Sequence, residues 1–233
     1  MDIKKYIPNT ITCFNLVAGC IAGVMALQGN LSLATLWIIL AAVFDFFDGF
    51  AARLLKAYSP IGKELDSLAD VVSFGVAPGM MVFQVLSDAC RIAEIGERGA
   101  WIPYLAFVIP ALSGLRLAKF NIDTRQTTSF IGLPVPAHAL FWASTAYSVS
   151  PFMGANPYLF IAATVVLSVL TSALLVSEIP MFSLKIKSLK WKGNEYRYIL
   201  VICAVVFVAV FGVLGISGTI LLYILLSIFN RRR

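Results

Sequence analysis

The chain has 233 residues, of which 60% are hydrophobic and only 13% are charged. A soluble domain of this length is about 45–50% apolar and about 25% charged, so this composition excludes an ordinary soluble protein and indicates a polytopic membrane protein. The net charge of +6 is typical of membrane orientation signals and does not indicate binding to nucleic acid. The four cysteines lack metal-binding spacing, and with His138 as the only histidine a histidine-rich metal site is excluded.

Apolar segments near the ~20 residues that a helix needs to cross hydrocarbon follow one another along the chain. The first could be taken for a signal peptide, but Asn15 interrupts its apolar core and more spanning segments follow. The last two could form one long hydrophobic block, since they are parted mainly by Gly212 and Gly215. We expect a single all-α domain over residues 1–233, a membrane bundle of about eight transmembrane helices, at about residues 11–27, 31–56, 60–86, 101–119, 133–149, 158–176, 198–211 and 216–229.

Basic residues are distributed unequally between the two sides of the membrane that eight spans define. The side without the termini has only Arg91 and Arg98. The positive-inside rule therefore predicts a multi-pass protein of the cytoplasmic membrane with both termini in the cytoplasm, where the second and third spans also meet. The basic residues on that side are Lys4, Lys5, Arg53, Lys56, Lys63, Arg116, Lys119, Arg125, Lys185, Lys187, Lys190, Lys192, Arg197, Arg231, Arg232 and Arg233.

Acidic residues concentrate in the second and third spans, although carboxylates are costly to bury there. Five of the twelve acids fall between Asp45 and Asp70. Asp45 and Asp48 are three residues apart and Asp66 and Asp70 are four apart, and each spacing keeps both side chains on one helix face. A short turn near residues 57–59 makes the two helices antiparallel. Asp48 then lies level with Asp66 and Asp45 level with Asp70, so four carboxylates converge.

Converging carboxylates repel one another unless cations are bound between them. Mg²⁺ and Mn²⁺ are the natural occupants, because these hard divalent cations prefer oxygen ligands. Two such ions would suit phosphoryl chemistry on a diphosphate. Gly49 would let a ligand approach the backbone, and Arg53 can bond to phosphate. The residues alone leave two alternatives: ion pairs of the acids with Arg53, Lys56 and Lys63, or an ion path through a transporter.

The same stretch resembles the signature of the CDP-alcohol phosphatidyltransferase family. Its fixed positions, all at the family's spacing, are Asp45, Asp48, Gly49, Ala52, Arg53, Gly62, Asp66 and Asp70. The resemblance implies that the four aspartates hold two divalent metal ions and that Asp70 is also the general base. The contacts that it implies to the CDP part of the substrate come from Asn9, Thr12, Gly49, Ala52, Arg53 and Ser59. Asn9 could instead be a plain helix cap after Pro8.

Three further stretches resemble one branch of this family, the membrane-type phosphatidylserine synthases. They are residues 66–78 (DSLADVVSFGVAP), 114–121 (GLRLAKFN) and 130–137 (FIGLPVPA). This resemblance implies transfer of a phosphatidyl group from CDP-diacylglycerol to L-serine, with release of CMP, by a homodimer in the lipid bilayer. It also implies a six-helix catalytic core over about residues 8–177 and two extra helices over about 198–229. His138 departs from the small residues expected there, and we interpret it as lining a helix interface.

A serine acceptor carries a carboxylate, which needs a fixed cation in its site. Arg116, Lys119 and Arg125 lie near the cytoplasmic end of the fourth span, with the first two on one helix face. We expect Arg116 or Arg125 to bind the carboxylate in preference to Lys119, because a guanidinium pairs with it bidentately. The same three residues could be ordinary positive-inside residues, or could serve a glycerol-phosphate or inositol-phosphate acceptor.

Overall fold

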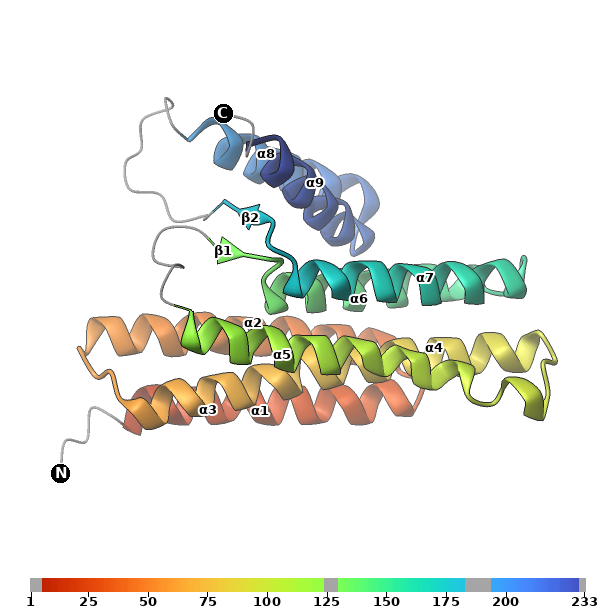
Figure 1. Ribbon diagram of the computed structural model, residues 1–233, viewed down its shortest axis with the longest axis horizontal. Helices are drawn as coiled ribbons and strands as arrows, with labels where there is room; N and C mark the ends of the chain where they lie inside the picture. The colour runs from red at the N-terminus through yellow and green to blue at the C-terminus, as the bar shows by residue number, and fades with distance from the viewer. Residues whose placement is uncertain (1–5, 124–129, 183–193, 231–233) are drawn as a thin grey trace.

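Figure 1 shows the computed structural model, which describes residues 6–123, 130–182 and 194–230 of the chain. Most helices run along a common direction, and the last two form a hairpin inclined to the others. Two short strands, β1 (Phe130–Ile131) and β2 (Pro180–Met181), pair antiparallel. The helices are α1 (Tyr6–Leu27), α2 (Leu31–Leu54), α3 (Pro60–Asp70), η2 (Val71–Val76), α4 (Ala77–Ile92), η3 (Glu97–Gly99), η4 (Ile102–Phe107), α5 (Val108–Ile122), α6 (Val135–Val149), η5 (Ser150–Phe152), α7 (Pro157–Val176), α8 (Glu195–Phe211) and α9 (Leu214–Asn230).

The described residues form eight helical spans, which confirms the predicted polytopic bundle. The third span is one continuous 33-residue helix built from α3, η2 and α4, and the fourth runs from η3 through α5. Together with α1, α2 and α7, these are five helices long and apolar enough to cross a membrane. The other three spans, α6, α8 and α9, have 15, 17 and 17 residues. They are shorter than the ~20 residues expected of a helix that crosses hydrocarbon without tilt.

The last two spans are separate helices. Gly212 follows α8 with a φ of +58°, a conformation that glycine adopts without the steric cost other residues incur. The hairpin is attached to the bundle mainly through α9. The Ser217 hydroxyl lies 2.6 and 2.8 Å from the hydroxyls of Ser144 and Thr145 on α6. The Tyr223 hydroxyl donates to the carbonyl of Phe182, just after β2, at 3.0 Å.

The third span changes its helical pitch just after Asp70, where the six residues of η2 form a π-helix. Within this turn the N–H of Ala77 donates to the carbonyl of Val72, five residues earlier. Pro78 is the next residue and has no N–H with which to continue the ordinary α-helical pattern. Single π-turns inside α-helices are often found at functional sites. Here the π-turn directly follows Asp70, one of the two buried acids of the acidic stretch.

Small residues allow α1 to approach the third span closely. Gly19 of α1 faces Ser73 of η2 so tightly that a Cβ at this glycine would overlap the Ser73 backbone. The Ser73 hydroxyl donates to the backbone carbonyl of Asn15 at 2.9 Å. On the other side of the third span, a Cβ at Gly75 would lie 3.2 Å from the Ser113 side chain of α5. These contacts hold α1 and α5 against the part of the third span that follows Asp70.

Candidate active site

The carboxylates of α2 and α3 meet in one cluster. One oxygen from each of Asp45, Asp48 and Asp66 lies within 4.8 Å of the other two. The predicted pairing of Asp48 with Asp66 across the turn is confirmed by this distance. Asp45 also belongs to this group, so three of the four carboxylates converge as the sequence predicts. Asp48 is buried, whereas Asp45 and Asp66 are half-buried.

Asp70 lies one helical turn after Asp66 and is only 8% exposed. It interacts electrostatically with the three clustered aspartates. The amide Nδ2 of Asn15, on α1, lies 3.4 Å from its Oδ1 and donates to it. Asn15 is itself fully buried. In the sequence, Asn15 is a polar residue inside an apolar segment. In the structure, its side chain has Asp70 as a hydrogen-bond partner.

The acids are not neutralised by ion pairs with the nearby bases. Among the described residues, the structure records no ion pair within 4.0 Å between these four aspartates and Arg53, Lys56 or Lys63. Asp66 Oδ1 is buried and has no hydrogen-bond partner among those residues. The salt-bridge alternative is therefore wrong. A cluster of oxygen ligands with one of them unsatisfied fits a hard divalent cation such as Mg²⁺ or Mn²⁺.

A cavity of about 230 Å³ opens beside the cluster, between α1, α2 and the start of α3. We call it the Asp48 cavity. It is lined by all six residues expected to contact CDP, by two of the acids, and by five further residues from α1, the turn and the start of α3. The lining residues are Pro8, Asn9, Thr12, Asp48, Gly49, Ala52, Arg53, Ala57, Tyr58, Ser59, Gly62, Lys63 and Asp66. Sequence reasoning missed Tyr58 and Lys63 as lining residues because no motif position marks them.

Two of the predicted CDP contacts have a second role in the fold. The Thr12 hydroxyl donates to Asp48 Oδ2 at 2.8 Å and thereby orients a carboxylate of the cluster. Ser59 caps α3 by accepting the N–H of Gly62 at 3.1 Å. Asn9 lies inside the first turns of α1, so the interpretation of Asn9 as a plain helix cap is wrong. Its side chain faces Gly62 across the cavity.

Two glycines make room for polar side chains in this cavity. A Cβ at Gly62 would lie 3.0 Å from both Asn9 Oδ1 and Ser59 Oγ. A Cβ at Gly49 would lie 3.3 Å from Arg53 Nη1, which folds back over the glycine one turn earlier on the same helix. Both distances are tighter than an ordinary van der Waals contact. The glycines of the motif therefore allow Asn9, Ser59 and Arg53 to gather at one place.

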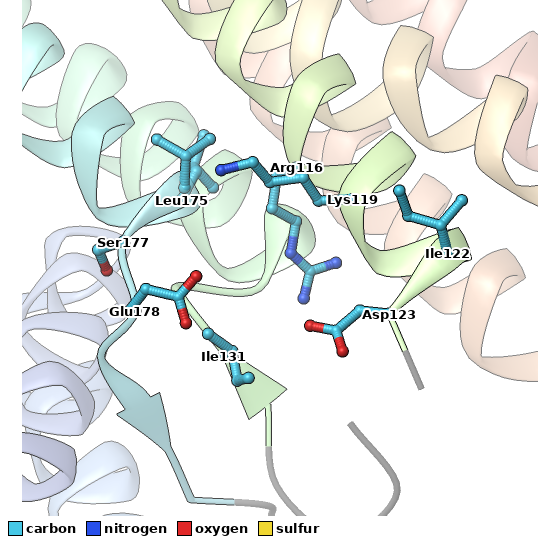
Figure 2. Close-up of a pocket in the computed structure, with 9 residues that line it drawn as sticks. Arg116, Lys119, Ile122, Asp123, Ile131, Leu175, Ser177 and Glu178 are labelled. Atoms are coloured by element: carbon cyan, nitrogen blue, oxygen red, sulfur yellow. The ribbon is translucent and has the colours of Figure 1, made fainter. Parts of the chain in front are cut away.

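A second cavity, of about 340 Å³, lies at the end of α5 and is called here the Arg116 cavity (Figure 2). It is lined by Arg116, Lys119, Ile122, Asp123, Ile131, Leu175, Val176, Ser177 and Glu178. Arg116 and Lys119 are thus brought together, whereas Arg125 lies outside the described residues. The Arg116 guanidinium stands 5.0 Å from the centre of the Phe120 ring and interacts electrostatically with Asp70. Asp70 and Arg116 thus influence each other's charge, although none of the four aspartates lines this cavity.

His138 lies far from solvent, at the interface between α6 and α7. Its Nε2 is 3.0 Å from the Thr171 hydroxyl, and the indole N–H of Trp142 donates to the same hydroxyl at 3.0 Å. His138 lines neither the Asp48 cavity nor the Arg116 cavity. The interpretation of His138 as a residue of a helix interface is confirmed.

The amino-acid sequence matches a protein family over most of its length. The model of the CDP-alcohol phosphatidyltransferases covers residues 5–210. The chain belongs to this family. It is therefore a membrane-embedded transferase, and the transporter alternative loses its basis.

Curated relatives carry the name of the branch that the sequence resembles. The CDP-diacylglycerol–serine O-phosphatidyltransferase of Bacillus subtilis (strain 168) is 37% identical over 149 residues, which are 64% of this chain and 80% of that protein. The enzyme of the same name from Helicobacter pylori (strain ATCC 700392 / 26695) is 31% identical over 224 residues, 93% of this chain and 88% of that one. The archaetidylserine synthase of Methanothermobacter thermautotrophicus is 32% identical over 137 residues, with coverage of 58% and 54%. The resemblance to phosphatidylserine synthases is thus confirmed.

Asn15 contacts Asp70 but does not belong to the motif, and its substitution tests this contact. We expect Asn15→Leu, a replacement of similar volume, to lower kcat by about 10- to 100-fold, because a hydrogen bond to a buried charged group is lost. The KM for the CDP-lipid should change little, since Asn15 does not line the Asp48 cavity. Steady-state assays of CMP release measure both constants. Thr10→Val, on an exposed face of α1, is the matched control, and an unchanged kcat in Asn15→Leu would contradict the role.

Proposed function

We propose that this transferase moves the phosphatidyl group of CDP-diacylglycerol to L-serine and releases phosphatidylserine and CMP. The observation that carries the proposal is the acid cluster beside a cavity that all six expected CDP contacts line. The Asp48 cavity offers Asn9, Thr12, Gly49, Ala52, Arg53 and Ser59 to a CDP group. The Arg116 cavity offers cations to an acceptor with a carboxylate. Relatives from two bacteria that bear the name CDP-diacylglycerol–serine O-phosphatidyltransferase support the choice of substrates.

We propose that Asp45, Asp48, Asp66 and Asp70 hold two divalent ions, Mg²⁺ or Mn²⁺. The close approach of three carboxylates and the unsatisfied Asp66 oxygen support this assignment. Bound ions of this kind neutralise the charge that develops on phosphate oxygens during transfer. Thr12, through its bond to Asp48, orients one of the proposed ligands.

In this reaction Asp70 acts on the acceptor, and Arg53 acts on the leaving group. Asp70 accepts the proton of the serine hydroxyl, and the hydroxyl oxygen forms a new bond to the phosphorus that carries diacylglycerol. The bond from this phosphorus to the oxygen of CMP breaks, and CMP leaves. Arg53, beside Gly49 in the Asp48 cavity, binds the phosphate of the leaving CMP. Burial of Asp70 among helices keeps water from competing with serine for the same phosphorus.

Serine is held by its carboxylate in this scheme. Arg116 is the principal contact, since it is buried and its guanidinium can pair bidentately with a carboxylate. Lys119 lines the same cavity and adds a second positive charge. Arg125 remains a sequence-based candidate. A glycerol-phosphate or inositol-phosphate acceptor is the alternative, because each would also need basic residues.

We further propose the arrangement of the enzyme in its membrane. Both termini and both cavities face the cytoplasm of the cell, where serine is available, and the strong excess of basic residues on that side supports this orientation. The whole chain acts as one domain, with a catalytic core at about residues 8–177 and extra helices at about 198–229. The family resemblance supports a homodimer.

The acceptor assay tests the proposal directly. Purified protein in detergent or vesicles receives CDP-diacylglycerol, Mg²⁺ or Mn²⁺, and one of three acceptors: serine, glycerol 3-phosphate or inositol phosphate. We expect serine alone to release CMP and to yield a labelled lipid. Release of CMP with a phosphate acceptor and none with serine would refute serine as the substrate while leaving the family assignment intact.

A further inference from the structure

The Arg116 cavity carries charges of both signs. Arg116 and Lys119 contribute two positive charges, and Asp123 and Glu178 contribute two negative ones. The cations come from α5, whereas the acids come from two loops: Asp123 directly follows α5, and Glu178 lies between α7 and β2. In Figure 2 the two carboxylates lie on either side of the Arg116 guanidinium. The folded chain thus brings acids to a place where the sequence predicts only bases.

The guanidinium at the centre of this cavity is not saturated. Arg116 is only 7% exposed, and its Nη2 is buried without a hydrogen-bond partner among the described residues. A buried polar group without a partner is costly, and a ligand in this cavity can supply the partner that Nη2 lacks. The Arg116 side chain is anchored by the Phe120 ring, which fixes the position of the charge.

We propose that Glu178 and Asp123 bind the ammonium group of the amino-acid acceptor while Arg116 binds its carboxylate. The cavity then recognises a zwitterion, because its described lining offers both cations and carboxylates. This inference rests on the proposed function, and it names the residues that select the class of acceptor. Serine carries its ammonium and its carboxylate on one carbon, so opposite charges on neighbouring walls suit it.

The same acids disfavour the alternative acceptors. Glycerol phosphate and inositol phosphate carry about two negative charges and no positive one, so two carboxylates in the cavity wall would repel them. A site made for phosphate would instead be lined by cations alone. Asp123 and Glu178 are therefore specificity residues that do not touch the reacting phosphorus.

An acceptor analogue tests the proposal in the wild-type enzyme. The compound 3-hydroxypropionate, called here the desamino analogue, keeps the hydroxyl and the carboxylate of serine but lacks the ammonium. We expect its KM to exceed that of serine by about 10- to 100-fold. This is the change in affinity that the loss of one charge-assisted hydrogen bond produces. Equal use of serine and the desamino analogue would overturn the proposal, and this test requires no variant to fold.

Substitutions of Glu178 and Asp123 test whether these two residues bind the ammonium group. Glu178→Gln and Asp123→Asn, singly and together, should raise the KM for serine by about tenfold or more. They should not raise the KM for the anionic desamino analogue, which the two carboxylates repel. Arg116→Gln should raise both. Glu97→Gln, at the opposite end of the same span, is the control and should match the wild type. The KM for CDP-diacylglycerol should stay constant in the acidic variants.

The outcomes separate this inference from the proposed function. If the wild type uses serine and the double variant keeps the wild-type KM for serine, only the role of Asp123 and Glu178 is refuted. The same holds if the KM values for serine and for the desamino analogue rise equally. If the wild type uses a phosphate acceptor and no serine, both proposals fail, because two carboxylates would then face a dianion.

Discussion

Asp70→Asn is expected to lower the rate of CMP release by at least about 10²- to 10⁴-fold, the usual contribution of a general base. Asparagine has nearly the same shape as aspartate but cannot accept the proton of the serine hydroxyl. Asp70 does not line the Asp48 cavity, so binding of the CDP-lipid should be largely preserved. Turnover assays together with titration of CDP-diacylglycerol against the purified variant measure the two effects.

The control for this substitution is Asp88→Asn. Asp88 pairs with Arg91 at 2.8 Å near the far end of the third span, where loss of one exposed ion pair should leave the rate within about twofold of the wild type. If Asp70→Asn retains wild-type turnover, the proton must go to another group. If it loses both turnover and CDP-lipid binding, Asp70 contributes mainly to the metal centre or to the fold.

Removal of divalent metal should abolish activity and also lower the stability of the folded protein. The clustered carboxylates of Asp45, Asp48 and Asp66 repel one another when no cation lies between them. Mg²⁺ or Mn²⁺ at about 100 times its Kd should add about 2.7 kcal/mol to the free energy of unfolding. Thermal unfolding with and without chelator measures this gain independently of catalysis, and readdition of metal should restore CMP release.

Single substitutions should show that the metal ions which support activity and stability bind at the acid cluster. Asp66→Asn removes a ligand whose Oδ1 has no other partner in the described structure, so both activity and the gain in melting temperature should need much higher metal concentrations. Glu64→Gln lies two residues away in the same helix, outside the cluster, and should behave as the wild type. A melting temperature that does not respond to metal in the wild type would count against a metal centre here.

Much of this architecture follows from local pattern. Apolar runs of suitable length predict the membrane helices, because hydrocarbon admits only segments that satisfy their own backbone hydrogen bonds. The spacing of Asp45, Asp48, Asp66 and Asp70, with a short turn between them, predicts that carboxylates converge, since helical periodicity and an antiparallel pair determine which side chains meet. The predicted CDP contacts also line one cavity, as their shared motif implies.

Other features depend on contacts between distant segments, which periodicity does not encode. Asn15 reaches Asp70 across 55 positions because Gly19 lets α1 lie directly against η2. Glu178 joins Arg116 because β1 and β2 pair and carry the end of α7 beside α5. Nothing in the neighbourhood of either residue in the sequence signals these meetings. The acid cluster is thus a property of a short local stretch, whereas the support of Asp70 and the position of Glu178 beside Arg116 arise only when helices far apart in the chain pack together.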